Sequence, residues 1–518
     1  MEQWCIRLDG SQLPSRADIG GKAHGIARMR RLGLPVPDAF VLPTSIGRSY
    51  HARGVSLPDE AWEAVRRSIA DLEAAQGRTF GRGPSPLLVS VRSGAAQSMP
   101  GMMDTVLNLG MNDTVQEALA AESGNAQFAQ DTHRRFIESY ARHVLHAEVD
   151  FEEPRPPAEL RRTVEQACGV SVPEDPFEQL QGAIGAVFGS WNSPRCIAYR
   201  RHHRISDEGG TAVTVQAMVF GNLDENSGTG VFFTRDPATG DPQPYGDFLP
   251  RGQGEDVVSG TVTPLHLDSL KNRLPDVYDE LINAGALLER DAKDSQDIEF
   301  TIERGRLYIL QTRNAKRSPA AAIRIAVELE NEGLISREEA LQRVGADQVE
   351  AVLKATIDPE VLDRAVVVAT GESACPGIAS GLAVGDADAA IDRESEGEAA
   401  ILVRHSTSPE DVHGMIAAVG VCTEVGGKTS HAAVVSRELG RPCIVGCGEG
   451  ALQGLIGQVI TMDGDTGWIY AGELPAVQPT VNDHPGLAEL VSWAAEHSGV
   501  LNSAHPLRKL ATDQRSGA

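Results

Sequence analysis

The sequence predicts a multidomain protein of mixed α+β and α/β class, and three observations support this. Its 518 residues are enough for two or three domains of ordinary size. Residues 113–192 read as mostly helical, whereas residues 370–475 alternate short apolar strands with short helices. Hydrophobic residues make up 41% of the chain, which is ordinary for a protein with sizeable cores.

The net charge argues against some classes of binding partner, and the cysteines indicate the cellular compartment. The chain has 72 acidic and 47 basic residues and a net charge of −25, which argues against nucleic acid and anionic membranes as partners. The seven cysteines are scattered and form no CxxC pair, so reduced thiols are expected rather than a zinc site. The sequence has neither a secretory leader nor an apolar run of about 18 residues, so we expect a cytoplasmic protein.

Several elements of the N-terminal part can be placed before any function is considered. Ser56 and Pro58 mark a helix start, and the apolar strand 87–91 leads into Arg92. Strands are expected over 211–220 and 230–234, joined by a Gly/Asn/Asp/Ser loop. In the helical stretch, one apolar stripe at helical spacing reads as core: Leu180, Ile184, Val187, Phe188 and Trp191.

A hairpin predicted at 296–313 carries a group of polar side chains. If its turn takes three residues, Glu299 pairs with Gln311 and Asp297 pairs with Arg313. Carboxylate and amide oxygens of this kind suit Mg²⁺ that also binds phosphate oxygens and water. An exposed polar sheet face explains the same pattern, and the hairpin residues alone leave both readings open.

Three other segments have residues that can hold phosphate. Lys22 follows two glycines at a helix start, where N–H groups and the ammonium can meet an anion. Arg92 can bind phosphate in a bidentate manner, and the segment Ser227 to Gly230 is a glycine-rich loop. The plain alternatives are an ordinary helix start, a surface charge at a strand end and an ordinary hairpin loop.

Residues 426–435 say most about function. Two glycines lead through Lys428, Thr429 and Ser430 to His431, which opens a helix of small apolar residues. The free N–H groups and the positive dipole end of that helix would hold a phosphoryl group and keep His431 neutral and nucleophilic. A histidine that merely caps a turn is the alternative.

Taken together, these segments resemble the phosphoenolpyruvate-utilising enzymes. Residues 426–435, continuing to Gly446, are similar to their phosphohistidine motif, and residues 90–109 resemble the pyruvate, phosphate dikinase form of the nucleotide-domain motif. The resemblance runs from Gly20 to about Leu490. Further similar segments follow in the same order: 189–200, 211–237, 253–264 and 297–317.

The resemblance implies an ATP-grasp domain, a helical linker and a swivelling phosphohistidine domain. We expect no TIM barrel, because the family's C-terminal phosphoenolpyruvate/pyruvate barrel needs about 250 residues and the sequence stops at Ala518. The expected boundaries are 1–318 for the ATP-grasp domain, with a helical insertion at about 113–192, 319–369 for the linker and 370–475 for the phosphohistidine domain. Residues 476–518 form the C-terminal tail, in which a short helix is expected over 486–496 before a polar end.

The resemblance also implies an activity. ATP and phosphate, with Mg²⁺, would phosphorylate His431 and give AMP and pyrophosphate; a separate protein with a pyruvate/phosphoenolpyruvate barrel would then hold pyruvate or another acceptor. Thr429 and Ser430 would complete the catalytic motif, and Glu299 and Gln311 would bind the metal. The implied nucleotide-binding set is Lys22, Arg92, Asp297, Glu299, Gln311, Arg313, Gly228 and Gly230.

Two positions depart from the family pattern, and other functions stay open. Lys428 stands where the family usually has Met, and residues 250–252 replace the usual Asn-Ala. The alternatives are a self-contained phosphotransferase of antibiotic or phenol type and an inactive nucleotide-binding regulatory protein. The antibiotic enzymes have an acceptor domain between their nucleotide and histidine domains, and the interval 319–370 is too short for one. The implied nucleotide-binding residues and His431 are all retained, which argues against an inactive regulatory protein. A homodimer also remains open.

Overall fold

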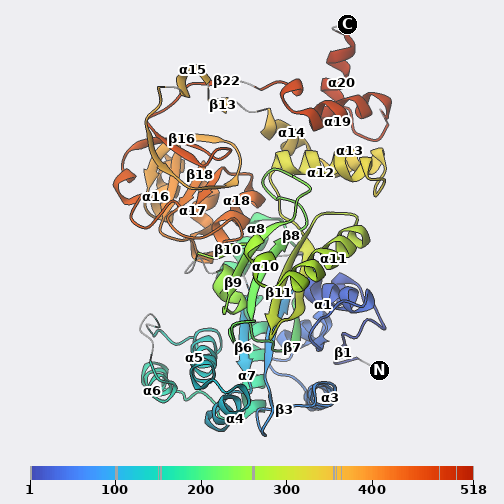
Figure 1. Cartoon of the computed structure of the whole chain (residues 1–518), viewed down its shortest axis with the longest axis vertical. Coiled ribbons are helices and arrows are strands. Elements are labelled where there is room, and N and C mark those ends of the chain that lie inside the picture. Colours follow the sequence, from blue (N-terminus) through green and yellow to red (C-terminus); the bar gives the residue numbers. More distant parts are fainter. Residues whose placement is uncertain are drawn as a thin grey trace. The chain divides into compact units, whose positions relative to one another are not determined.

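The computed structural model describes residues 3–97, 99, 103–149, 151, 155–258, 263–353, 356–357, 359–362, 364–477, 479–497 and 499–516. Parts of two predicted motifs, Ser98, Pro100–Met102 and Ser259–Val262, lie outside these residues. The chain forms two compact units (Figure 1), one of Met1–Gly228 with Phe300–Arg313 and one of Thr229–Glu299 with Asn314–Ala518. The domain boundaries implied by the resemblance stay a prediction.

The first unit is built on an antiparallel five-stranded sheet of order β1-β2-β7-β5-β6. Every residue of β7 is buried, so both faces of this strand are covered. The strands are β1 (Ile6–Arg7), β2 (Ala39–Leu42), β5 (Val89–Gly94), β6 (Thr105–Leu109) and β7 (Ala212–Ala217), with a small pair β3 (Thr79–Phe80) and β4 (Pro86–Leu87).

Helices cover this sheet and include the helical stretch predicted over 113–192. Leu180, Ile184 and Phe188 of α7 are fully buried in the core, as their helical spacing predicted. Asp175 caps α7 by accepting from two backbone N–H groups, and Pro176 follows at the first helical position. The helices are α1 (Arg16–Arg31), α2 (Thr44–Ala52), α3 (Asp59–Gln76), α4 (Asp113–Ser123), α5 (Ala126–His143), α6 (Pro157–Cys168), α7 (Pro176–Ser190) and α8 (Pro194–His202).

Helix α1 is kinked at Gly20, which brings the backbone of the Gly-Gly-Lys segment against β5. Gly20 has φ of 77°, and a Cβ there would lie 2.2 Å from the carbonyl oxygen of Gly94. The next N–H, that of Gly21, donates to the carbonyl of Ala95 at 2.8 Å. Only glycine accepts both the positive φ and this close approach, so the sequence places Lys22 beside the end of β5.

A second five-stranded sheet has the order β10-β9-β8-β11-β12. Its strands are β8 (Gly228–Phe233), β9 (Tyr245–Pro250), β10 (Leu265–His266), β11 (Gln296–Glu303) and β12 (Arg306–Asn314), and nearby helices are α9 (Gly254–Val258), α10 (Asp268–Arg273) and α11 (Pro275–Ala292). One detail of the prediction was wrong. The strand was expected to begin at Gly230, but β8 begins at Gly228, so Gly228 lies in a fully buried strand rather than in the loop.

The turn of the predicted hairpin was also wrong by one residue. It takes two residues, Arg304 and Gly305, with φ of 52° and 75°. Two positive φ values define a primed hairpin turn, whose twist suits the flanking strands. The predicted pairing of Glu299 with Gln311 assumed a three-residue turn. The observed turn is one residue shorter, so that assumption was wrong.

The phosphohistidine-like region is a mixed eight-stranded sheet of order β14-β21-β20-β16-β17-β18-β19-β15. Strands β16 to β19 are parallel neighbours, as expected where strands alternate with helices. The elements are β14 (Val367–Thr370), β15 (Glu372–Cys375), β16 (Ile378–Val384), α16 (Ala387–Ser395), β17 (Ala400–Arg404), η1 (Pro409–Asp411), α17 (Val412–Ala417), β18 (Gly420–Thr423), α18 (His431–Leu439), β19 (Cys443–Val445), η2 (Gln453–Leu455), β20 (Val459–Asp463) and β21 (Trp468–Ala471).

Helices from the linker and the C-terminal region share one core. The capping box predicted at Ser336 is present, since Ser336 and Glu339 exchange side-chain-to-backbone bonds of 3.2 and 3.0 Å. The helix predicted over 486–496 is present. The polar end predicted after it is also partly helical, because Leu507 and Ala511 of α20 bury their side chains in this core. The elements are α12 (Pro319–Asn331), α13 (Arg337–Arg343), α14 (Ala346–Val352), α15 (Pro359–Leu362), η3 (Val481–Asp483), α19 (Pro485–Glu496), α20 (Pro506–Ser516) and the strand pair β13 (Thr356–Ile357) and β22 (Ala476–Val477).

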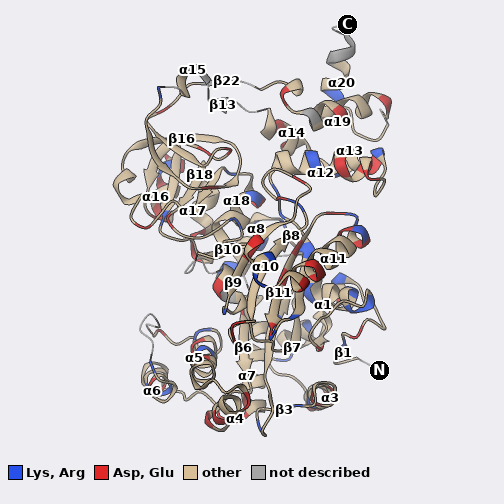
Figure 2. Ribbon diagram, viewed as in Figure 1, with Lys and Arg blue, Asp and Glu red and all other residues tan. Residues whose placement is uncertain are grey.

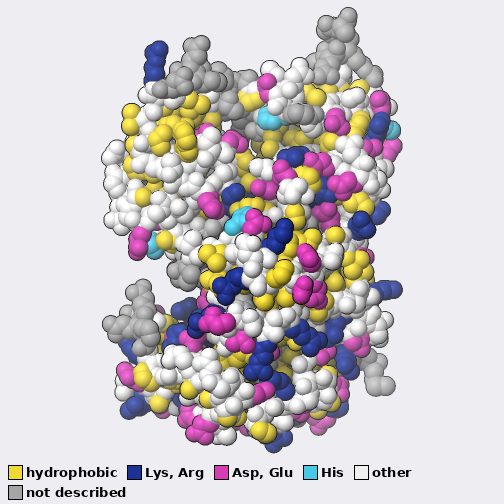
Figure 3. All heavy atoms as spheres, in the orientation of Figure 1, with side chains coloured by type: hydrophobic (Ala, Val, Ile, Leu, Met, Phe, Trp, Pro, Cys, Tyr) yellow, Lys and Arg dark blue, Asp and Glu magenta, His cyan; other side chains and the backbone are white. Residues whose placement is uncertain are grey.

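Charged residues of both signs are interspersed along the ribbon and over the face shown (Figures 2 and 3). No helix within the described ranges is both long and apolar enough to cross a bilayer. All seven cysteines lie in the described part of the chain, and all are free.

Candidate functional site

His431 lies at the carboxyl edge of the parallel strands. It is the first residue of α18, which follows β18, and Ser430 occupies the N-cap position with extended φ and ψ. The Ser430 hydroxyl is buried and makes no cap bond. Ligands of open α/β sheets bind outside the carboxyl ends of the strands, so His431 occupies the part of this fold where chemistry is expected.

The two ring nitrogens of His431 have different surroundings. Nδ1 lies 3.1 Å from Oγ1 of Thr407, whereas Nε2 is buried and has no hydrogen-bond partner. Burial lowers the pKa of His431 to about 4, although the carboxylate of Asp411 acts in the opposite direction. The imidazole is therefore neutral at pH 7, as the helix start had suggested, but burial is the main cause. A neutral imidazole with an unengaged nitrogen is a nucleophile.

The backbone of the His431 loop is fixed from within its own domain. The N–H of Ser430 donates to the carbonyl of Gly427 at 3.0 Å. Arg437, six residues after His431 on the same helix, donates through Nη2 to the carbonyl of Lys428 and through Nη1 to that of Ala374. Burial lowers the pKa of Arg437, and the nearby Cys375, Cys443 and Asp297 partly offset this shift.

Two contacts join this loop to strand β9. Thr429 Oγ1 donates to Asp247 Oδ2 at 2.6 Å, and Lys428 Nζ lies 4.7 Å from the ring centroid of Tyr245. Tyr245 and Asp247 are two residues apart on one strand and so lie on the same face. Burial raises the pKa of Asp247, and the bond from Thr429 opposes that rise. Sequence reasoning missed Asp247, because 182 residues separate it from Thr429.

The turn that carries Thr407 is held by an ion pair. Arg404, at the end of β17, lies 3.2 Å from Asp411 and also donates to the carbonyl of Gly385. Asp411 in turn accepts from the N–H of Ser408 at 2.8 Å. Sequence reasoning missed Thr407 and Asp411 as well. The available signal was a polar run directly after an apolar strand, because such runs meet at one edge of a parallel sheet.

Three predicted nucleotide-binding residues come together in the first unit. Arg92 of β5 donates through Nη2 to Gln311 Oε1 at 3.2 Å and through Nη1 to Gln216 Oε1 at 3.4 Å. Cβ of Lys22 lies 3.9 Å from the position of a Cβ built on Gly94, which ends β5. The ammonium-bearing residue, the guanidinium and the amide thus belong to one region, as an anion site requires.

The remaining predicted residues are placed on strands, and their roles stay predictions. Asp297 and Glu299 lie on β11, Arg313 lies on β12, and Asp297 is buried. Within the described residues, no group of three or more His, Cys, Asp or Glu side chains could hold a metal ion. Glu299 and Gln311 each offer oxygen donors of the kind that Mg²⁺ prefers, and that ion usually completes its shell with phosphate and water.

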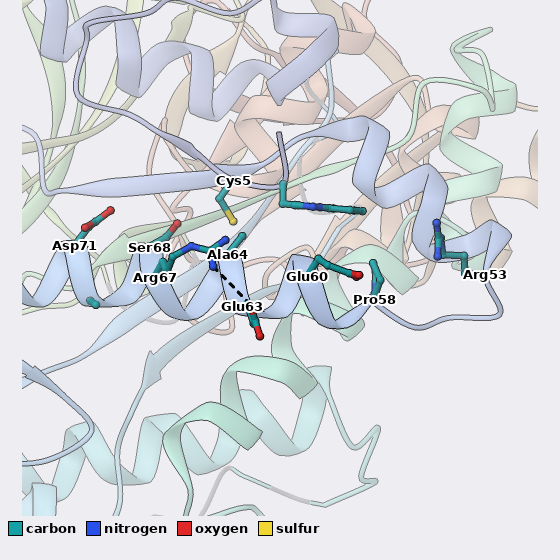
Figure 4. A pocket seen from close by; sticks show the side chains of 11 residues that line it. Cys5, Arg53, Pro58, Glu60, Glu63, Ala64, Arg67, Ser68 and Asp71 are labelled. Carbon is teal, nitrogen blue, oxygen red and sulfur yellow. Dashed lines mark ion pairs between the residues drawn. The ribbon is translucent and has the colours of Figure 1, made fainter. Parts of the chain in front are cut away.

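A separate hollow of about 1010 Å³ runs along α3 and contains none of the predicted site residues. Figure 4 shows Arg67 and Glu63 paired on that helix, 3.7 Å apart, with Cys5 and Ser68 nearby. Burial raises the pKa of Cys5 to about 12, so this thiol is not a reactive thiolate.

The comparisons with known proteins define the class of these domains. Residues 52–278 match the family described as pyruvate phosphate dikinase, AMP/ATP-binding domain, and residues 396–467 match the mobile domain of PEP-utilising enzymes. The fold class predicted from the sequence, with an ATP-grasp nucleotide-binding domain and a phosphohistidine domain, is therefore confirmed. The described residues contain no (β/α)₈ barrel.

The relatives specify the branch of that family. The chain is 42% identical to a pyruvate, phosphate dikinase of Rhizobium meliloti and 41% identical to one of Clostridium symbiosum; each alignment covers 95% of this chain and 60% of the relative. A chloroplastic pyruvate, phosphate dikinase of Arabidopsis thaliana is 42% identical, covering 92% and 53%. The chain is similar to the pyruvate, phosphate dikinases in both matched domains, and it spans about 60% of the length of the first two relatives.

Proposed function

We propose that the chain is a pyruvate, phosphate dikinase-type phosphotransferase whose covalent carrier is His431. ATP and phosphate are its substrates in this step, and AMP and pyrophosphate are its products. The observation that carries the proposal is the neutral imidazole of His431, with Nε2 unengaged, at the start of a helix in the matched mobile domain. The matched AMP/ATP-binding domain supplies the other substrate site.

In the proposed reaction, the Nε2 lone pair attacks the β-phosphorus of ATP. The bond from that phosphorus to the oxygen shared with the α-phosphate breaks, and AMP leaves with the electron pair. The γ-phosphoryl group then passes to phosphate, which gives pyrophosphate and leaves one phosphoryl group on His431. Such transfers depend mainly on positioning and charge neutralisation, which are the roles we assign to Lys22, Arg92 and Arg313.

Mg²⁺, when bound, would neutralise phosphate charge, and Glu299 and Gln311 are the residues we propose to hold it. Asp297 completes the polar set on the same hairpin. Gly228 and Gly230, although in a strand, leave the backbone of β8 open to close approach by phosphate. Thr429 and Ser430 position the loop before His431, Thr429 through its bond to Asp247.

We further propose that pyruvate, or an acceptor of similar chemistry, is bound by a separate protein that receives the phosphoryl group. The alignments cover 60% of the length of each bacterial relative, so they leave the acceptor site of this chain open to experiment. The seven free cysteines support a reducing compartment, and we place the protein in the cytoplasm.

The test uses the purified chain with Mg²⁺, phosphate and ATP labelled at the β-phosphate. We expect an acid-labile label on the protein, found by intact mass, with AMP and phosphate-dependent pyrophosphate in solution. Pyruvate added to the labelled chain should not remove the label until an acceptor protein is supplied. Absence of label with ATP still bound would contradict the proposed first step.

A further inference from the structure

The turn after β17 contacts the nitrogen of His431 that the proposed reaction does not use. Oγ1 of Thr407 lies 3.1 Å from Nδ1, and Thr407 is itself buried. Nε2, on the other side of the ring, is buried and has no hydrogen-bond partner. One ring nitrogen is therefore engaged by the protein, and the other is left for a reacting atom.

The position of the single ring proton follows from this asymmetry. A neutral imidazole carries its proton on either Nδ1 or Nε2. A proton on Nε2 would create a buried donor without an acceptor, and orphaned buried donors are rare in native structures. A proton on Nδ1 can be donated to Thr407 Oγ1, which leaves the lone pair on Nε2.

We propose that Thr407 is a positioning residue that holds His431 in the tautomer protonated on Nδ1 and thereby directs phosphorylation to Nε2. The inference rests on the proposed function, because it assigns the attacking nitrogen of the proposed phosphohistidine. During the attack, Nδ1 keeps its proton while positive charge develops on the ring. Thr407 Oγ1 accepts the bond from that N–H, which strengthens as the donor becomes charged.

Asp411 and Arg404 support the contact between Thr407 and His431. The carboxylate of Asp411 favours positive charge on His431, so it stabilises the ring as the phosphorus–nitrogen bond forms. Arg404 holds Asp411 at 3.2 Å, and Asp411 accepts from both the N–H and the hydroxyl of Ser408. These bonds fix the turn immediately after Thr407, as a supporting group must be fixed to select a tautomer.

The experiment compares Thr407→Val and Thr407→Ser in the whole chain, with Thr370→Val as a matched control at an exposed position of the same domain. Ring ¹⁵N shifts of His431, measured without nucleotide, report the tautomer. We expect the wild type and Thr407→Ser to carry the proton on Nδ1. Thr407→Val should shift the population toward Nε2–H and slow labelling about 10-fold or more at unchanged ATP binding, whereas Thr370→Val should match the wild type.

The isomer of phosphohistidine gives a second readout, by ³¹P spectroscopy or isomer-specific antibody. The wild type should carry phosphorus on Nε2, and any label on Thr407→Val should include the Nδ1 isomer. An unchanged tautomer ratio, isomer and rate in Thr407→Val would overturn the role of Thr407. A wild type that takes no label would instead contradict the proposed function, while the ¹⁵N shifts would still report on Thr407.

Discussion

The loop that carries His431 and the strand end that carries Arg92 are built in different ways. His431 is a half-buried, neutral ring next to Thr407, and its loop is held by Arg437 of its own helix and by Asp247 of β9. Arg92 is a half-buried cation that donates to the amide oxygens of Gln216 and Gln311. The comparison teaches that one region presents an uncharged ring and the other a cation, which is what we expect of a nucleophile and of a phosphate contact.

The largest effect is expected at the nucleophile. His431→Asn should lose all acid-labile label, because the amide has no nucleophilic nitrogen in place of Nε2. ATP binding should be retained, because His431 belongs to a different matched domain from the AMP/ATP-binding segment. Intact mass and a nucleotide-binding titration measure the two properties. Label that persists on the Asn variant would show that another residue is the carrier.

A smaller but still large effect is expected at the anion site. Arg92→Ala should slow labelling of His431 by about 100-fold, since a lost charge-stabilising donor typically costs that much. Arg92→Lys should recover only part of the rate, because an ammonium cannot contact both amide oxygens and a phosphate in a planar fork.

Rates of label incorporation at saturating ATP measure this effect. Arg67→Ala is the control, because that side chain is 69% exposed and pairs only loosely with Glu63 on α3. Equal rates in Arg92→Ala and the control would remove Arg92 from the site and erase the contrast between the two regions.

The same contrast explains what could be predicted from the sequence. The loop before His431 is contiguous in the sequence, so its glycines, its hydroxyl residues and the helix start could be recognised together. The residues that support the loop could not be recognised in this way. Thr407 lies in the turn after β17 and Asp247 lies on β9, and their spacing in the sequence matches no motif. On the nucleotide side, the sequence predicted the candidate residues one by one. Only the structure shows that Arg92 and Gln311 are in contact, because 219 residues separate them.

Fold predictions failed where a local signal had two readings. Gly228 was expected in a loop, but it lies in a buried strand, a place where glycine allows close backbone approach. Arg304 takes a positive φ, which is uncommon for a non-glycine residue, so a two-residue turn was not evident. The helix α20 follows a polar stretch, but Leu507 and Ala511 recur four residues apart and bury one face.

The smallest effect concerns stability and has opposite signs at two aspartates, one in each compact unit. Burial raises the pKa of Asp247 above its ordinary value of 3.8, so the folded chain binds that proton more tightly than the unfolded chain. The free energy of unfolding should therefore fall as the pH rises from about 4 through the raised pKa. Asp131 of α5 is the counterpart: burial alone would raise its pKa, but ion pairs with Arg135 and Arg134 outweigh burial and lower it. Its contribution should be lost as the pH falls.

Urea unfolding of Asp247→Asn and Asp131→Asn between pH 3 and 8 separates these signs. The Asn at position 247 can still accept from Thr429, so this variant should gain stability relative to the wild type as the pH rises above 4. Asp131→Asn should lose stability relative to the wild type as the pH rises from 3 toward about 4, because the wild-type carboxylate ionises between its arginines below its ordinary pKa of 3.8. The transition of each unit is followed separately, since a chain of two units need not unfold in one step. Parallel pH profiles for the two variants would mean that Asp247 is not held as a buried acid against Thr429, and the loop's attachment to β9 would then need another cause.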